Sequence, residues 1–425
     1  MKVFKNKNDI TLLYEKNYGV STTAIAIYVR CGSVFERDEN AGISHVIEHM
    51  MFKGSDKYNN IKLNELLDLY SVSFNAFTSR DITAYYAITT EKYIKKCAEL
   101  FSDMFFNAKF PEKEFELEKG VILSELQASK TDDDDIAADN LERIAYGKSR
   151  RAIPIIGFED TIKSLTRNDL IEFKKKMYTS NNTFLSITGH ISESKAKSIF
   201  DTFFKGKIDV SNVNNYEYVT DLDNYSQDNY VEHINDSEES TTYISYDTYS
   251  PKNLKEKTIL SLYDLIFSQG MSSRLFTTIR EKNGLVYSIN SYLSGAKEEQ
   301  KRYIVFSCDN SNEIKTLKLV NKEVLKLAEK GISKKEFYNA KIRMINLLKS
   351  SKDSLIKMSN SFVKELIISN EEVSLDDIIL ECERLSYEDI GSYKNKIFLA
   401  NTAKISFVGK KSELFVISDL YNIVR

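Results

Sequence analysis

The sequence predicts an α+β protein of two structurally similar domains, each a mostly antiparallel sheet packed with helices. At 425 residues the chain is longer than one ordinary hydrophobic core requires. The order of predicted elements also recurs, because both halves contain two strands, two helices, two more strands and two helices. We therefore expect a first domain at residues 1–207, a polar linker at 208–227 and a homologous second domain at 228–425, related by internal duplication.

In the first half, alternating or continuous apolar residues rich in β-branched side chains predict strands, and apolar residues at helical spacing predict helices. The expected strands are residues 10–15, 22–30, 72–78, 82–89 and 183–188. The expected helices are a helix carrying residues 45–49 within the run 41–54, and residues 60–70, 91–107, 111–127, 132–146 and 192–205. Pro111 suits a first helical position. Four aspartates at 132–135 could bind a divalent cation, but acids at a helix start interact favourably with the helix dipole, which favours the plain helix start.

The second half repeats this order. Its expected strands are residues 230–234, 241–248, 286–293 and 303–308, and its expected helices are 255–267, 274–282, 313–329 and 334–348. Residues 111–126 align with 333–348, sharing Lys-Glu-Phe and a lysine four residues later. In this alignment Glu118 corresponds to Ala340 and Glu125 to Leu347, and no histidine occurs at 260–267. We infer that only the first half keeps metal chemistry.

Composition excludes several classes of protein. With 42% hydrophobic and 28% charged residues, the chain has the composition of a globular protein, and a net charge of −3 offers no basic field for nucleic acid or anionic membranes. A polar start at residues 1–7 and the lack of an apolar run near ~18 residues lead us to expect a cytoplasmic protein without leader or membrane span. Four scattered cysteines without C-x-x-C indicate reduced thiols rather than cysteine-bound zinc.

The strongest functional signal is the segment from His45 to His49, which reads HVIEH. Two imidazoles four residues apart lie on one face of a helix and can share a metal ion. H-x-x-E-H is the inverted form of the zincin motif, in which the histidines bind Zn²⁺ and the glutamate acts on water. The alternative is a core helix with hydrogen-bonded histidines. The chain has only four histidines, and two of them occur in this one turn, which favours the metal.

A third ligand is expected from the helix at residues 111–127. Glu118 and Glu125 are two turns apart and can share a face, whereas Glu116 points elsewhere. Apolar Val121, Ile122 and Leu126 lie around that face, and a buried carboxylate without a partner is costly, so the pair favours a cation. An ordinary amphipathic helix with solvated acids is the alternative.

Four segments together resemble the inverted-motif zinc metallopeptidases typified by pitrilysin, insulin-degrading enzyme and the mitochondrial processing peptidase. They are HVIEHMMFKG from His45, NAFTSRDITAYY from Asn75, the Glu118/Glu125 helix and MSSRLFTTIREKNGLVYS from Met271. The resemblance implies one Zn²⁺ per chain on His45, His49 and Glu125, with Glu48 as general base. It also implies that Glu118 orients a ligand or water.

The same resemblance implies that Arg280 and Tyr287, from the domain without zinc, bind the substrate backbone and the oxyanion. One departure is the segment at residues 147–157, GKSRRAIPIIG, which lacks the His-Pro-Leu pattern of many relatives. That difference leaves the role of this loop open but affects no zinc residue.

We expect a zinc metalloendopeptidase, a hydrolase that cleaves peptides or small unfolded polypeptides bound in extended form in an enclosed chamber. The strand Phe74, Asn75, Ala76 and Phe77 is the expected edge for substrate, and an ordinary half-buried strand is its alternative. Because the chain carries both residue sets, a homodimer is expected, with Arg280 and Tyr287 reaching the zinc of their own or the opposite subunit. A non-catalytic or regulatory partner subunit of a processing-peptidase-like complex is the alternative function. The physiological substrate is not specified by the sequence.

Overall fold

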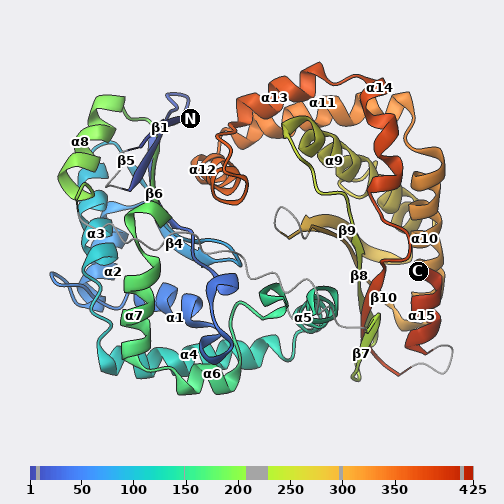
Figure 1. The fold of residues 1–425 in the computed structure, drawn as a ribbon, viewed down its shortest axis with the longest axis horizontal. Helices are drawn as coiled ribbons and strands as arrows, with labels where there is room; N and C mark the ends of the chain where they lie inside the picture. The colour runs from blue at the N-terminus through green and yellow to red at the C-terminus, as the bar shows by residue number, and fades with distance from the viewer. Residues whose placement is uncertain (6–9, 148, 207–227, 296–299, 412–415, 425) are drawn as a thin grey trace. The chain divides into compact units, whose positions relative to one another are not determined.

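The computed structural model describes residues 1–5, 10–147, 149–206, 228–295, 300–411 and 416–424, and these form two compact units (Figure 1). Within them, unit 1 comprises residues 1–127, 153–206 and 351–374. Unit 2 comprises residues 128–152, 228–350 and 375–424. The predicted linker at 208–227 lies outside the described residues. No helix in the described part of the chain is both long and apolar enough to cross a membrane.

Unit 1 contains a six-stranded sheet with the strand order β1-β2-β6-β3-β5-β4. Its strands are β1 (Lys2–Phe4), β2 (Thr11–Lys16), β3 (Thr22–Val29), β4 (Ser73–Thr78), β5 (Thr83–Thr90) and β6 (Thr183–Gly189). The β2 and β6 strands pair in parallel, and every other pair is antiparallel. β4 forms one edge of this sheet.

Unit 2 contains a five-stranded sheet with the strand order β7-β11-β8-β10-β9. Its strands are β7 (Tyr230–Ile234), β8 (Glu239–Asp247), β9 (Val286–Ser294), β10 (Lys301–Asp309) and β11 (Lys404–Gly409). Here β7 and β11 pair in parallel and the other pairs are antiparallel. Apart from β1, the two sheets have the same order and the same strand directions, so the predicted α+β fold of two similar domains is confirmed.

Helices on one face of the unit 1 sheet enclose its main core. They are α1 (Ile43–Met50), α2 (Asn60–Tyr70), α3 (Ile94–Phe106), α4 (Glu112–Ser129), α6 (Glu159–Ser164), α7 (Arg167–Met177) and α8 (Glu193–Phe203). Successive side chains of β3 point to opposite faces of the sheet. Ile25 and Ile27 belong to this core, whereas Ala26 and Tyr28 belong to the cluster on the other face. Ile25 and Ile27 are fully buried.

The second face of the unit 1 sheet is covered by a segment from far along the chain, α12 (Leu355–Lys364) followed by the π-helical turn η8 (Glu365–Ser369) (Figure 1). This contact is partly polar. Tyr28 donates a hydrogen bond to Asn360 at 2.6 Å, and the hydroxyls of Ser186 and Ser359 lie 3.0 Å apart. Phe362 and Leu366 add apolar contact to the strands.

In unit 2 the corresponding face of the sheet is covered by a segment from the first half of the chain. The main core of unit 2 lies under α9 (Leu254–Phe267), α10 (Glu313–Lys330), α11 (Lys334–Ser351), α13 (Leu375–Arg384), α14 (Tyr387–Ile390) and α15 (Ile417–Val424). The opposite face is covered by α5 (Asp133–Tyr146) (Figure 1). Leu141 and Ile144 of α5 pack against Tyr303. The predicted division at 207 and 228 therefore differs from the compact units, because α5 buries its apolar side on the sheet of the second half of the chain and α12 on the sheet of the first half.

Matching lysines anchor α4 and α11 in the two units. The Lys119 ammonium donates to the carbonyl oxygens of Lys163 and Leu165 at 3.0 and 2.9 Å. The Lys341 ammonium donates to the corresponding carbonyls of Glu383 and Leu385, both at 2.7 Å. Lys119 and Lys341 are the aligned lysines of the sequence repeat, so the duplication extends to individual contacts.

Two local predictions are decided by backbone and capping geometry. Asp132 caps α5, accepting hydrogen bonds from the N–H groups of Asp134 and Asp135 at 3.0 and 3.1 Å, as expected of a helix start. The predicted helix at 274–282 is instead a π-helical turn over most of its length, η6 (Phe276–Glu281). The N–H of Lys282 reaches back to Thr277 at 3.1 Å, one residue further than in an α-helix.

Candidate metal centre

The motif helix α1 presents two different faces. Val46, Ile47 and Met50 are completely buried in the core of unit 1. His45 and His49, four residues apart, occupy the other side, and their imidazole rings meet edge to face with centroids 4.5 Å apart. Burial of the apolar side thus fixes where both imidazoles point.

The start of α1 is held by a buried carboxylate that comes before the helix. Glu36, only 1% exposed, accepts hydrogen bonds from the N–H groups of Gly42 at 2.6 Å and Ser44 at 2.8 Å. Gly42 has φ +95°, a conformation that favours glycine, and its own side chain cannot cap the helix. Glu36 therefore supplies the acceptor that free N–H groups at a helix start require.

Three potential ligand atoms converge beside this helix, all within 4.8 Å of one another: one each from His45, His49 and Glu125. The Nε2 atoms of the two histidines are 3.2 Å apart, and His49 Nε2 is 3.8 Å from Glu125 Oε2. Ligands about 2.0–2.1 Å from a tetrahedral zinc ion lie about 3.3 Å from each other, so the spacing suits zinc.

The donor chemistry also fits a cation. Two ring nitrogens that face each other share one hydrogen at most, whereas a cation accepts both lone pairs. Nδ1 of His45 is buried and has no hydrogen-bond partner among the described residues. Burial, together with the nearby His49, lowers the pKa of His45 to about 4, which keeps its ring neutral and able to bind a metal.

On the side of the ring that carries Nδ1, His49 contacts Glu118, which in turn pairs with Lys53. His49 Nδ1 donates to Glu118 Oε1 at 2.8 Å, and Lys53 Nζ is 2.5 Å from the other oxygen, Oε2. Burial is the largest single influence and would lower the pKa of His49, but the hydrogen bond to Glu118 and the charges of Glu118, Glu48 and Glu125 together outweigh it, and the pKa is raised. Burial acts to raise the pKa of Glu118, yet His49 and Lys53 lower it. Glu118 thus fixes the tautomer that directs His49 Nε2 toward Glu125.

Glu48 lies at the end of the edge strand β4. Its Oε2 accepts a hydrogen bond from Thr78 Oγ1 at 2.5 Å. Burial raises the pKa of Glu48, although the Thr78 hydrogen bond opposes this shift. A carboxylate with a raised pKa exchanges protons more readily near neutral pH, as a general base must.

The predicted substrate strand, residues 74–77, forms the centre of β4. β4 pairs only with β5 among the described strands, so its outer edge has backbone groups without a strand partner in this chain. Its side chains are intermediate or exposed rather than fully buried. An extended peptide added to this edge would run past Glu48, because Thr78 ends the strand.

Arg280 and Tyr287 lie in unit 2, on η6 and β9. The Arg280 guanidinium carbon is 5.1 Å from the centroid of the Tyr287 ring, and Tyr287 is 85% exposed. The two predicted substrate-binding residues are therefore neighbours. Their action on a substrate at the metal centre stays a prediction.

The metal-site residues predicted from spacing are brought together, but burial differs from expectation. Glu118 is buried as expected, whereas Glu125 and Val121 are both about half exposed, because they lie on the sides of α4 away from the buried Ile122 and Leu126. Sequence reasoning missed Lys53 and Thr78. Both lie inside segments that carried the resemblance, but nothing in the local sequence indicates their partners.

Comparison with known proteins decides the family. Residues 11–158 match the insulinase model of peptidase family M16, and residues 164–344 match the model described as the peptidase M16 inactive domain. The chain belongs to the insulinase family, peptidase family M16. The predicted family resemblance is confirmed.

Its relatives cover almost the whole chain. The chain is 29% identical over 412 residues to the uncharacterized zinc protease YmxG of Bacillus subtilis, covering 95% of this chain and 97% of that protein. It is 25% identical over 408 residues to the human mitochondrial-processing peptidase subunit beta, covering 93% and 82%. A protease from Helicobacter pylori shares the fold with a TM-score of 0.85 at 19% identity, covering 96% and 98%.

Proposed function

We propose that this family member is a zinc-dependent metalloendopeptidase that hydrolyses peptides or small unfolded polypeptides bound in extended form. One observation carries the proposal: potential ligand atoms of His45, His49 and Glu125 converge next to the partly buried carboxylate of Glu48. Relatives named zinc proteases support zinc as the metal. One ion per chain is proposed because one group of three potential ligands is found among the described residues.

The residues divide the work of peptide hydrolysis. When bound, zinc supplies Lewis-acid activation of a water molecule and of the scissile carbonyl. Glu48 accepts the proton of the attacking water and passes it to the leaving amine, while Thr78 holds Glu48 in place. Glu118 holds the His49 ring from behind, with Lys53 as its counter-charge.

Substrate binding would use both units. An extended peptide adds to the β4 edge at residues 74–77 through backbone hydrogen bonds, which explains how different sequences could be accepted. Arg280 and Tyr287 then bind the carbonyl oxygen that becomes negatively charged during attack. We further propose a cytoplasmic homodimer that encloses the substrate in a chamber, with this pair acting in its own or the opposite subunit.

The first experiment separates metal binding from catalysis. Purified wild type, Glu48→Gln and His49→Ala are compared for zinc content and for cleavage of a quenched fluorescent peptide. Glu48→Gln should keep zinc and lose turnover, whereas His49→Ala should lose both. Cleavage by Glu48→Gln at the wild-type rate contradicts the assignment of the general base. Zinc binding without hydrolysis in wild type favours the partner-subunit alternative.

The second experiment tests assembly. Glu48→Gln and Tyr287→Phe chains are each assayed alone and after mixing. Partial recovery of activity in the mixture indicates that Tyr287 acts on the zinc site of the opposite subunit. Absence of recovery, with dimers present by mass, assigns both residue sets to one chain.

A further inference from the structure

The guanidinium of Arg280 lies between two aromatic rings. Its central carbon is 4.7 Å from the centroid of Phe276 and 5.1 Å from that of Tyr287. Both distances are within the range of cation–π contact. Within the described part of the chain, no carboxylate or carbonyl pairs with the Arg280 guanidinium.

This environment leaves the donors of the guanidinium available. An arginine paired with a carboxylate donates its N–H groups to that partner. An arginine in contact with aromatic faces keeps its N–H groups available, because they point outward from the edge of the guanidinium. The Arg280 guanidinium is thus in contact with two rings, and no described carboxylate or carbonyl occupies its N–H groups. That arrangement suits recognition of a carbonyl oxygen that gains negative charge.

Tyr287 alone is a poor support for this arrangement. Its side chain is 85% exposed, so little besides Arg280 restrains its ring. Phe276 is only partly exposed and lies four residues before Arg280 on the same π-helical turn. Leu275 and Ile279 on that turn are completely buried, which fixes the backbone under Phe276.

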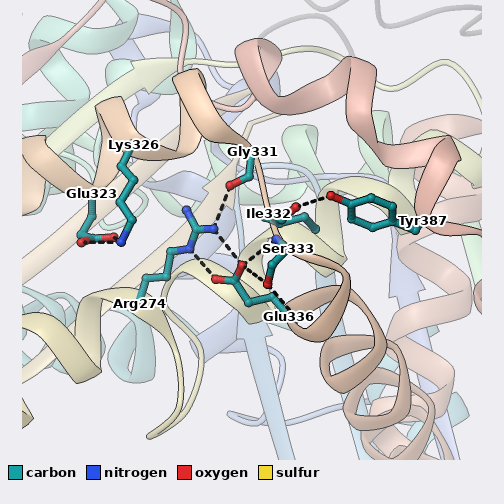
Figure 2. A network of polar contacts seen from close by, with 8 residues as sticks. All are labelled: Arg274, Glu323, Lys326, Gly331, Ile332, Ser333, Glu336 and Tyr387. Atoms are coloured by element: carbon teal, nitrogen blue, oxygen red, sulfur yellow. Dashed lines mark hydrogen bonds and ion pairs between the residues drawn. The ribbon is translucent and has the colours of Figure 1, made fainter.

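The start of the turn is anchored by a network of polar contacts around Arg274 (Figure 2). Arg274 Nε and Nη2 donate to the two Glu336 carboxylate oxygens at 2.7 and 3.0 Å, and Nη2 also donates to the Gly331 carbonyl at 2.8 Å. Ser333 donates its N–H and hydroxyl to Glu336 Oε2 at 2.7 and 2.8 Å. The backbone that carries Phe276 is therefore tied to the beginning of α11.

We propose that Phe276 is a positioning residue that holds the Arg280 guanidinium flat against Tyr287 and so presents its N–H groups to the substrate carbonyl. The inference rests on the proposed function for the role of Arg280 in hydrolysis, but the stacking itself is independent of that role. Phe276 acts through Arg280 and does not contact the reacting atoms.

An experiment without turnover tests the stacking. Protons of an arginine that lies over aromatic faces resonate upfield, so the Arg280 Nε–Hε signal, assigned with Arg280→Lys, should be shifted in wild type. In Phe276→Leu it should return toward the position of exposed arginines, and in Phe276→Tyr it should stay shifted. An Arg280 signal that Phe276→Leu leaves unchanged overturns the proposal. This readout remains decisive even if wild type hydrolyses no peptide, a result that would refute only the proposed function.

Kinetics test the consequence. Phe276→Leu should lower kcat/KM by about 3- to 10-fold, mostly through kcat, and Phe276→Tyr should restore most of it. In an Arg280→Gln background, Phe276→Leu should have little further effect, because the residue it positions is gone. An equal loss in both backgrounds overturns the proposal.

A matched control is provided by another cation between two rings of unit 2. Lys396 Nζ lies 4.5 and 4.8 Å from the Tyr249 and Tyr393 ring centroids. Tyr393→Leu removes one ring of that stack and should leave kcat/KM and the Arg280 signal unchanged. A loss of activity equal to that of Phe276→Leu would show a general effect of disturbing unit 2 and overturn the assignment.

Discussion

The two units share a strand order but differ at the helices that correspond to α4 and α11. Both helices are anchored by a lysine that donates to two carbonyls, Lys119 in unit 1 and Lys341 in unit 2. In unit 1 the helix then carries Glu118 and Glu125 toward His49, whereas in unit 2 the aligned residues are Ala340 and Leu347.

This difference indicates that the residues that hold the fold are distinct from the residues that form the metal centre. Backbone hydrogen bonds, sheet order and the lysine anchors are common to both units, so they hold the fold without the metal residues. The metal centre depends on a few side chains added to that frame. Variants that exchange these side chains between units should therefore alter function and stability independently.

Among variants that keep all three proposed ligands, the largest effect is expected from Glu118→Ala, which places the unit 2 residue in unit 1. It removes the acceptor of His49 Nδ1, and loss of such a partner typically lowers metal affinity about 10- to 100-fold. Competition with a chromogenic zinc chelator measures the change. Glu116→Ala, on an exposed face of the same helix, is the control, and wild-type affinity in Glu118→Ala would contradict the orienting role.

Removing the lysine anchor should lower the free energy of unfolding by a similar amount in both units. Lys119→Met and Lys341→Met each remove a charged donor to two carbonyls, and each should lower the free energy of unfolding by about 1–3 kcal/mol. Urea unfolding measures this, with exposed Lys113→Met and Lys335→Met as aligned controls. A loss in only one unit would show that the anchors are not equivalent.

Lowering the pH should reduce the stability of unit 2 by protonating Glu336. Burial acts to raise the pKa of Glu336, but Arg274 and Ser333 outweigh it and lower the pKa to about 2. Because the folded pKa is depressed, the stabilisation is present above the ordinary pKa and is lost as pH falls from about 4.5 toward 2. With a side chain about one-third exposed, we expect about 1–2 kcal/mol.

Glu336→Gln should flatten the dependence of unfolding free energy on pH across this window. The aligned variant in unit 1, Glu114→Gln, should change it less, since Glu114 accepts a hydrogen bond from the neutral Asn60 amide at 2.7 Å. Urea titrations at several pH values measure both. Identical pH profiles for wild type and Glu336→Gln would contradict the assigned ion pair.

The smallest effect is expected from Lys53→Met, which removes the cation behind Glu118. Zinc affinity should fall by about 3- to 10-fold, less than in Glu118→Ala, because the hydrogen bond to His49 remains. Lys53→Arg should restore part of it. Lys57→Met is the control, because Lys57 forms an exposed ion pair with Glu99 at 3.4 Å. A fall as large as that of Glu118→Ala would assign Lys53 a greater role.

Much of the fold could be predicted from the sequence because the spacing of apolar residues and the sequence repeat are periodic and local signals. The repeated Lys-Glu-Phe segment led to the duplication, and helical spacing placed His45 and His49 on one face. The strand β11 and the helices after α11 were not predicted. Periodicity shows that α5 has an apolar side, but it cannot show which sheet that side covers, so the packing of α5 and α12 across the two halves of the chain was not predicted.

The site shows the same limit. Spacing along α4 placed Glu118 and Glu125 together, yet their different burial depends on how deeply each turn of the helix packs. Glu36, Lys53 and Thr78 form contacts with residues that are separate in sequence, and no local pattern signals such partners. Their positions follow only from the assembled sheet and helices.

Zinc stoichiometry shows directly whether unit 1 alone holds a metal centre. Native mass spectrometry should find one zinc ion per wild-type chain. Glu125→Leu, which introduces the unit 2 residue Leu347 at the aligned position, should lose zinc while keeping the unfolding curve of zinc-free wild type. The reciprocal Leu347→Glu should still bind a single ion, because unit 2 has no histidine at residues 260–267. Two ions per wild-type chain, or full zinc retention by Glu125→Leu, would contradict the account.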